Sequence, residues 1–481
     1  MKVSLKNIGL LNEAEFDVGD LTIICGENNT GKTYATYSLY GYLQLNSFAN
    51  NGENFYSYSL EIIKKNINNF KIDGFNLSVE KECFLKMLQE LEQAIQNRYI
   101  LYLPELLASN AENFLQSNFK EHTLSNLHKY FAKIIDNIND MNKFFSNFGA
   151  DIKSVDGNII VFDISFYKNI AKNDSLNSSD FFIIQLIRYI LLSKYPRAFI
   201  LSAERTGASM FYKELDVNKN EVLEQINNMS GKNIDIWDLL DKRYSRYPKP
   251  VKDNIYFIRE LDEISKRKSF IVEDEKSSLY NEIIGLLFNI VGGKYIVGSE
   301  GISFAPGAKK RATKGKFPVQ TSSSSVRALM ILSYYILNYC DKNDILMIDE
   351  PELNLHPNNQ ILIGRLLVLL VNAGIKVFIT THSDYIIREI SNCIMLNNLS
   401  DKQLLNFKNT YKTEYKLDFS KVKAYLAENN DGKNQLKQVK IDKNSGIFME
   451  TFNKSIDDQN NLQGLIFESV IKSNLDNKND K

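Results

Sequence analysis

One short loop constrains the fold of this chain more than any other part of the sequence. Residues 21–25 are almost all apolar, broken only by the β-favouring Thr22, and predict a buried strand. Residues 26–33 follow directly and fit the pattern G-x-x-x-x-G-K-[ST]. Beyond them, Leu39, Tyr42 and Leu43 share one side of a predicted helix. We therefore expect a strand–loop–helix unit here, with the loop at the end of a buried strand.

The composition of this loop, which we call the phosphate loop (residues 26–33), suits a phosphate group. Its two glycines allow backbone N–H groups to converge on phosphate oxygens, and the helix that follows adds the positive end of its dipole. Lys32 can neutralise the terminal phosphates, and the Thr33 hydroxyl can ligate Mg²⁺. A chance match in a Gly/Thr turn is the alternative, and the strand–loop–helix context argues against it. The predicted nucleotide-binding residues are Gly26, Glu27, Asn28, Asn29, Thr30, Gly31, Lys32 and Thr33.

A second apolar strand ends in two adjacent carboxylates. Residues 345–348 are all apolar and predict a core strand, with Asp349 and Glu350 at its carboxyl end. Because neighbouring strand residues point to opposite faces, the two carboxylates should divide the work. Asp349 would hold the Mg²⁺ shell, and Glu350 would polarise the attacking water. A solvated acidic turn is the alternative, and the phosphate loop in the same chain argues against it.

A third buried strand, residues 377–381, runs directly into His382, Ser383 and Asp384. A histidine at such a strand end can contact a terminal phosphate or orient the attacking water. The alternative is a helix-capping turn in which Ser383 or Asp384 is the N-cap and His382 is incidental. We predict a catalytic role for His382.

A run of serines precedes the apolar helix predicted for residues 326–339. Small hydroxyl residues at a helix start expose N–H and O–H donors that suit a phosphate, although a serine-rich N-cap needs no ligand. We call residues 322–325 the serine turn, and the predicted nucleotide contacts in it are Ser322, Ser323 and Ser324.

The order of these motifs resembles that of the ATP-binding cassette (ABC) ATPases, and within them the branch that contains SMC, RecF and the overcoming-lysogenisation-defect (OLD) ATPases. The phosphate loop matches the Walker A motif, residues 345–350 the Walker B motif, and His382 the switch histidine. The serine turn lies at the position of the signature motif, without its usual Leu-Ser-Gly-Gly sequence. Residues 352–357 occupy the D-loop position, with His356 where transporters carry aspartate.

Two further segments narrow the resemblance. The chain resembles the ATPase subunits of the PARIS and Septu anti-phage systems at two segments. These are residues 204–207 (Glu-Arg-Thr-Gly), after a strand, and residues 372–376, before the His382 strand. OLD proteins end in a Toprim nuclease, whose glutamate and Asp-x-Asp pattern we do not find after His382. We therefore expect no nuclease centre in this chain.

The resemblance implies an α/β fold, an ABC-type P-loop ATPase head. Its mixed sheet would have an antiparallel N-terminal part and a parallel core, and it would carry two largely helical insertions. The predicted parts are residues 1–49 (core with Walker A), 50–180 (helical insertion), 181–212 (core strand segment), 213–316 (second helical and hairpin insertion), 317–395 (core with signature-like motif, Walker B and switch histidine) and 396–481 (C-terminal cap).

The resemblance also implies a mechanism. ATP and Mg²⁺ would be the cofactors, and a homodimer or higher even homo-oligomer would close around two nucleotides, with the serine turn of one subunit capping the nucleotide of the other. We expect an ATP-hydrolysing switch or scaffold that controls a separate effector, a nuclease or toxin, in anti-phage defence. The alternative is a RecF/SMC-like ATPase of DNA recombination or repair; a hydrolase centre hidden in the chain is a third possibility.

Charge weighs against the DNA alternative. The 481-residue chain has 58 basic and 58 acidic residues, so it has no chain-wide attraction to nucleic acid or anionic membrane.

Two local basic features have more than one interpretation. Arg205 either reaches a phosphate or braces the core through an ion pair. A local basic loop is open to three interpretations: contact with DNA, contact with another subunit's nucleotide, or solvation alone. It contains Lys309, Lys310, Arg311, Lys314 and Lys316.

The remaining features predict a soluble cytoplasmic protein. The N-terminus lacks the apolar run of a signal peptide, and the most apolar stretches, residues 182–192 and 361–371, are short and each contain an arginine. The four scattered cysteines form neither a metal-binding pattern nor a disulfide framework.

Overall fold

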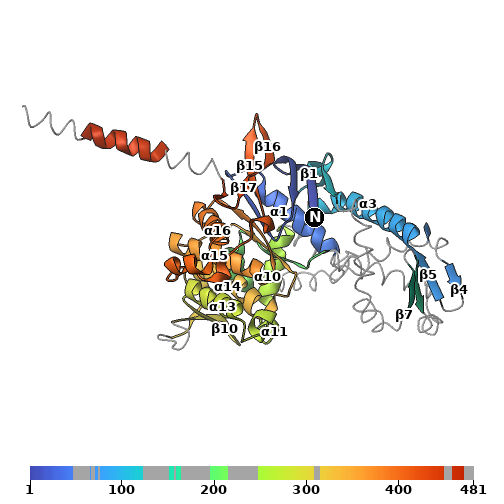
Figure 1. Cartoon of the computed structure of the whole chain (residues 1–481), viewed down its shortest axis with the longest axis horizontal. Coiled ribbons are helices and arrows are strands. Elements are labelled where there is room, and N and C mark those ends of the chain that lie inside the picture. The colour runs from blue at the N-terminus through green and yellow to red at the C-terminus, as the bar shows by residue number, and fades with distance from the viewer. Residues whose placement is uncertain are drawn as a thin grey trace, which may run out of the picture.

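A mixed sheet of nine strands forms the centre of the structure (Figure 1). The computed structural model describes residues 1–46, 65–66, 71–73, 76–122, 151–156, 159–163, 195–214, 247–307, 315–448 and 458–470. In spatial order the strands are β6 (Asn118–Glu121), β1 (Lys2–Ile8), β2 (Leu11–Asp17), β16 (Lys433–Gln438), β15 (Val422–Asn430), β3 (Leu21–Gly26), β14 (Lys376–Thr381), β13 (Ile345–Asp349) and β9 (Ala198–Leu201).

The sheet combines an antiparallel and a parallel part, as predicted. β1 pairs antiparallel with β2 and with β6, whereas β15, β3, β14, β13 and β9 run parallel to one another. The turn between β1 and β2 lies at Gly9 and Leu10, where Ile8 pairs with Leu11. Gly9 has a φ of +56°, a conformation that glycine adopts without the steric penalty of a side chain. The α/β fold class is confirmed.

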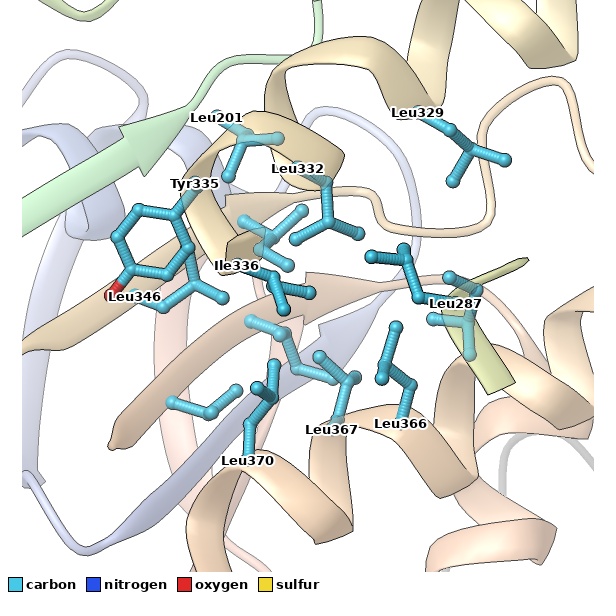
Figure 2. Packing of buried hydrophobic residues seen from close by; sticks show 14 of the residues in the cluster. Leu201, Leu287, Leu329, Leu332, Tyr335, Ile336, Leu346, Leu366, Leu367 and Leu370 are labelled. Atoms are coloured by element: carbon cyan, nitrogen blue, oxygen red, sulfur yellow. The ribbon is translucent and has the colours of Figure 1, made fainter. Parts of the chain in front are cut away.

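Helices cover both faces of the parallel strands. In β13, Ile345 and Met347 pack on the side of α1 (Lys32–Asn46) and α3 (Lys81–Leu106). Leu346 and Ile348 pack on the opposite side. They share a hydrophobic cluster with residues of α13 (Ser278–Val291), α14 (Ser324–Tyr334), α15 (Pro357–Asn372) and α16 (Asp384–Leu396). Figure 2 shows Leu346 in this cluster, with Leu287 of α13, Leu332 of α14 and Leu367 of α15. Burial on both faces explains why these strands are nearly continuous apolar runs.

Two strands of the predicted C-terminal cap (residues 396–481), β15 and β16, belong to the main sheet. β15 lies between β3 and β16, and its Ala427 pairs with Gly26. A Cβ atom at Gly26 would lie 2.1 Å from the Ala427 carbonyl oxygen, so only glycine fits here. The predicted cap is wrong for these two strands, because the local sequence pattern of β15 does not indicate that it pairs with β3, about 400 residues earlier in the chain.

The two insertions differ in kind. The described part of the first contains α3, which was predicted, together with a four-stranded antiparallel sheet: β4 (Lys71–Asp73), β5 (Asn76–Glu80), β8 (Ile159–Asp163) and β7 (Asp151–Asp156). The described part therefore combines one long helix with short strands. The helices predicted around residues 60–70, 134–145 and 180–192 lie outside the described residues, apart from residues 65–66.

The described part of the second insertion matches the expectation. It contains the helices α10 (Lys249–Arg259), α11 (Leu261–Ile264), α12 (Phe270–Glu273) and α13, followed by the hairpin of β10 (Gly293–Gly298) and β11 (Gly301–Pro306). Of the basic loop, only Lys316 lies within the described residues, where it is exposed. Within the described ranges, no helix is both long and apolar enough to cross a bilayer.

Candidate functional site

Three neighbouring parallel strands bring the predicted residues to one edge of the sheet. β14 pairs with β3 on one side, with Thr381 opposite Cys25, and with β13 on the other, with Thr380 opposite Asp349. The carboxyl ends of these strands therefore place the phosphate loop, His382 and Glu350 side by side. Ligands of open α/β sheets bind at this edge.

The phosphate loop is closed by its own lysine. Lys32 is the first residue of α1 and is 6% exposed, and its Nζ donates hydrogen bonds to the carbonyl oxygens of Gly26 (3.0 Å) and Glu27 (2.6 Å). The Thr30 hydroxyl donates to the same Glu27 carbonyl at 2.8 Å. Gly31 has a φ of +92°, which requires glycine. The loop thus holds a buried cation and a helix N-terminus at one point, the combination that binds phosphate.

Asp349 is the buried member of the carboxylate pair. It is 1% exposed, and burial raises its pKa to about 6, with Thr380 and Thr33 offsetting part of this shift. Its Oδ1 accepts a hydrogen bond from the Thr380 hydroxyl, whereas its Oδ2 is buried without a partner. An unpaired Asp349 oxygen, in a carboxylate that lies near the Thr33 hydroxyl, fits a bound Mg²⁺, because Mg²⁺ prefers such hard oxygen ligands.

The remaining ligands of such an ion would come from outside the protein. In the ranges that the structure describes, no three His, Cys, Asp or Glu side chains gather in a way that could hold a metal. A cation at Thr33 and Asp349 would therefore share its coordination with water and nucleotide phosphates, as Mg²⁺ usually does.

Glu350 and His382 form a pair at the open side of the site. His382 Nε2 lies 3.1 Å from Glu350 Oε1, and their side chains are 30% and 29% exposed. The hydrogen bond with His382 lowers the pKa of Glu350, opposed by partial burial. Water can thus reach Glu350 but not Asp349. The two carboxylates therefore differ in exposure, and the division of roles between them stays a prediction.

Two residues beside this pair were missed by the sequence analysis. Thr380 accepts the Glu350 N–H at both its carbonyl oxygen and its hydroxyl, each at 3.1 Å. Glu352 is half-buried, and its Oε1 accepts the His382 N–H at 2.5 Å. A polar residue at the end of an apolar strand is the only sequence signal for Thr380, and nothing in the sequence indicated that Glu352 turns inward.

Arg205 follows neither of the two interpretations left open for it. Its guanidinium donates to four backbone carbonyl oxygens, two of them in Asp349 and Glu350. It therefore braces the site through the backbone and not through an ion pair.

The serine turn acts as a helix start within its own chain. Ser323 is the N-cap of α14 and its Oγ accepts from the Val326 N–H at 3.4 Å, while Ser322 Oγ donates to the Pro318 carbonyl at 3.0 Å. None of the hydrogen bonds of Ser322, Ser323 or Ser324 reaches the phosphate loop. Ser383 likewise caps α16, as the alternative for that turn proposed, while its neighbour His382 contacts Glu350.

Comparisons with known proteins identify one family. Residues 1–387 match the family described as AAA ATPase domain. No curated protein matches the chain. Three solved structures are similar. An SMC head bound to the C-winged helix domain of ScpA has 11% sequence identity and a TM-score of 0.34, and the match covers 91% of this chain and 97% of that chain. The SMC head domain from Thermotoga maritima has 10% identity and a TM-score of 0.31, with 92% of this chain and 98% of that chain covered. An Smc head domain with an extended coiled coil, bound to the C-terminal domain of ScpA, from Pyrococcus furiosus, has 11% identity and a TM-score of 0.28, with 96% of this chain and 98% of that chain covered.

These TM-scores are too low to support an argument. The family match stands without them, since it spans most of the chain and includes the phosphate loop, Glu350 and His382. The chain belongs to the AAA ATPase domain family.

Proposed function

We propose that this ATPase hydrolyses ATP with Mg²⁺ at the shared edge of β3, β14 and β13 and works as a switch that controls a separate effector, a nuclease or toxin, in defence against phage. One observation carries the catalytic part: Lys32, Asp349 and the Glu350–His382 pair, 3.1 Å apart, lie at the ends of adjacent strands. The resemblance of residues 204–207 and 372–376 to anti-phage ATPases supports the biological part.

Each residue has a role that its surroundings suit. The phosphate-loop amides and Lys32 hold the phosphates, and Thr33 and Asp349 hold Mg²⁺, which neutralises phosphate charge when bound. Glu350, ionised and open to solvent, orients and polarises the water that attacks the terminal phosphate. His382 holds the Glu350 carboxylate and could also contact the terminal phosphate of bound ATP.

The switch requires a second copy of the chain. The serine turn caps α14 and does not reach its own phosphate loop, and the Ser324 hydroxyl makes no hydrogen bond within the described residues, so the start of this helix is available to another subunit's nucleotide. ATP would then close a two-fold interface, and hydrolysis would open it.

The biological role is tested with a phage-infection assay. Cells that carry this gene and its neighbouring gene should form fewer plaques than cells that carry the Lys32→Ala variant with the same neighbour. Equal plaque numbers, together with ATP-stimulated and salt-dependent binding of duplex DNA by the purified chain, would favour the DNA-repair alternative instead.

His382→Ala should lower the ATP turnover rate about 10²-fold, the size expected for a group that positions the base, while ATP affinity stays within about threefold. The reason is that Glu350 loses the hydrogen bond that aims its carboxylate. Steady-state phosphate release measures the effect. His122→Ala, on the far edge of the sheet beside Ser4, is the matched control and should keep wild-type turnover. Equal rates in both variants would contradict the role of His382.

Ser324→Glu should separate nucleotide binding from assembly. Glutamate is well tolerated in the first turn of a helix, but its charge would repel a phosphate presented by another subunit. We expect ATP affinity to stay unchanged and ATP-dependent dimerisation, measured by light scattering, to disappear. Ser324→Ala is the control and should still dimerise. A Ser324→Glu variant that dimerises normally would rule out the serine turn as the cap.

A further inference from the structure

Arg205 joins three separate parts of the chain at the site. It is the first residue of helix 205–214, which follows β9 after a short turn, and is 2% exposed. Its Nη1 donates to the carbonyl oxygens of Ser202 (3.0 Å) and Asp349 (2.7 Å). Its Nη2 donates to the Glu350 carbonyl (2.7 Å), and its Nε to that of Ala328 in α14 (3.3 Å).

A buried guanidinium is a costly way to hold backbone carbonyls together. Burial lowers the pKa of Arg205, and the negative charges of Asp349, Glu352 and Glu350 oppose this shift. The planar fork offers five N–H donors in fixed directions, whereas the lysine ammonium is a point charge on a flexible stem. Only arginine can reach carbonyls of three segments at once.

The bond to Glu350 fixes a strained backbone. Glu350 has a φ of +52°, which residues other than glycine rarely adopt. Its N–H is held by Thr380 and its C=O by Arg205, so both peptide units that flank it are fixed. This backbone conformation directs the carboxylate toward His382. Such strain persists only where the surroundings impose it.

Arg205 also contacts α14, the helix that starts at the serine turn. Ala328 lies near the start of α14, whose N-cap is Ser323. Ser209, one helical turn after Arg205, adds a second link, since its single hydroxyl proton is shared between the carbonyl oxygens of Arg205 (2.8 Å from Oγ) and Arg327 (3.2 Å). A displacement of α14 therefore acts directly on Arg205.

We propose that Arg205 is a positioning residue that couples the serine turn to Glu350. When the serine turn caps a nucleotide in a second subunit, α14 shifts, and Arg205 transmits the shift to the backbone of Glu350. Hydrolysis in one site thereby depends on engagement of the other. This inference rests on the proposed function and adds the path by which the two sites communicate.

The test compares Arg205→Lys with Arg197→Lys. Arg197 is the matched control because it also joins β9 to β13, at their opposite ends, through Asp344 (2.9 and 2.6 Å). We expect Arg205→Lys to lower kcat for ATP at least about tenfold with KM within about twofold, because the substrate contacts remain and only transition-state alignment is lost. Arg197→Lys should keep the wild-type kcat. If the wild type hydrolyses ATP and both variants match it, this inference fails alone; if the wild type hydrolyses none, the proposed function fails with it.

A measurement on the wild-type chain decides the matter if Arg205→Lys does not fold. Hydrogen–deuterium exchange is compared with and without a non-hydrolysable ATP analogue and Mg²⁺. Peptides that cover residues 322–330 and 349–352 should gain protection together, at the same analogue and protein concentrations. Protection of residues 349–352 at protein concentrations that leave residues 322–330 unprotected would overturn the coupling.

Discussion

Lys32→Ala should reduce the affinity for ATP at least about a hundredfold, roughly 2.7 kcal/mol of binding free energy. Lys32 is the buried cation of the phosphate loop, and burial lowers its pKa while Glu350 and Asp349 oppose that shift. Without the ammonium group, the phosphates would face these two carboxylates uncompensated in a site of low dielectric constant. Isothermal titration calorimetry with ATP and Mg²⁺ measures the loss, and ATP turnover should disappear with it.

Lys376→Ala is the matched control for this variant. Lys376 begins β14 and forms a partly exposed ion pair with Asp20 at 2.8 Å, at the end of the strands opposite the phosphate loop. Losing such a pair costs at most about 1 kcal/mol of stability and should leave ATP affinity unchanged. Wild-type ATP affinity in Lys32→Ala would remove the phosphate loop from the nucleotide site, and with it the catalytic assignment.

Glu350→Gln should stop hydrolysis but keep ATP bound. Glutamine preserves the shape of the side chain and can still hydrogen bond with His382. It lacks, however, the negative charge that polarises the attacking water and accepts its proton. We expect turnover to fall about 10²- to 10⁴-fold, the usual contribution of a general base, with ATP affinity equal to or above that of the wild type. Single-turnover measurements with radiolabelled ATP separate the two effects.

The same variant tests the switch. If hydrolysis opens the interface, Glu350→Gln should accumulate as an ATP-bound dimer, seen as a doubled mass in light scattering only when ATP and Mg²⁺ are present. Glu282→Gln is the control, since Glu282 lies on α13 and binds Lys412 and Tyr415. It should hydrolyse ATP normally and not accumulate as a dimer. A monomeric Glu350→Gln that holds ATP would exclude the closed dimer while leaving the nucleotide site in place.

Local sequence patterns were sufficient to find the parts of the site. The apolar runs of β3, β13 and β14 are buried on both faces, so each stands out in the sequence, and each leads directly into the phosphate loop, Glu350 or His382. The two-residue period of a strand also predicts that Asp349 and Glu350 point to opposite faces and differ in role. The burial of one and the exposure of the other agree with that reasoning.

Contacts between distant segments were beyond such patterns. Thr380, Glu352 and Arg205 act through backbone groups of residues far away in the chain. Any polar side chain can make hydrogen bonds of this kind, so its own neighbours in the sequence do not reveal its partner. The place of β15 beside β3 was missed for the same reason, because a strand's pattern shows which face is buried but not which strand lies next to it.

The amino-acid sequence alone determined which chemical groups this protein carries at its strand ends, because strand burial, glycine conformation and helix starts depend on residues close together in the chain. Only the tertiary structure decided how those groups meet. The order β3, β14, β13 and β9 arises when both faces of the sheet are buried at once, and that burial is a sum over segments from the whole chain. The left-handed conformation of Glu350, and the buried arginine that holds it, exist only after this assembly.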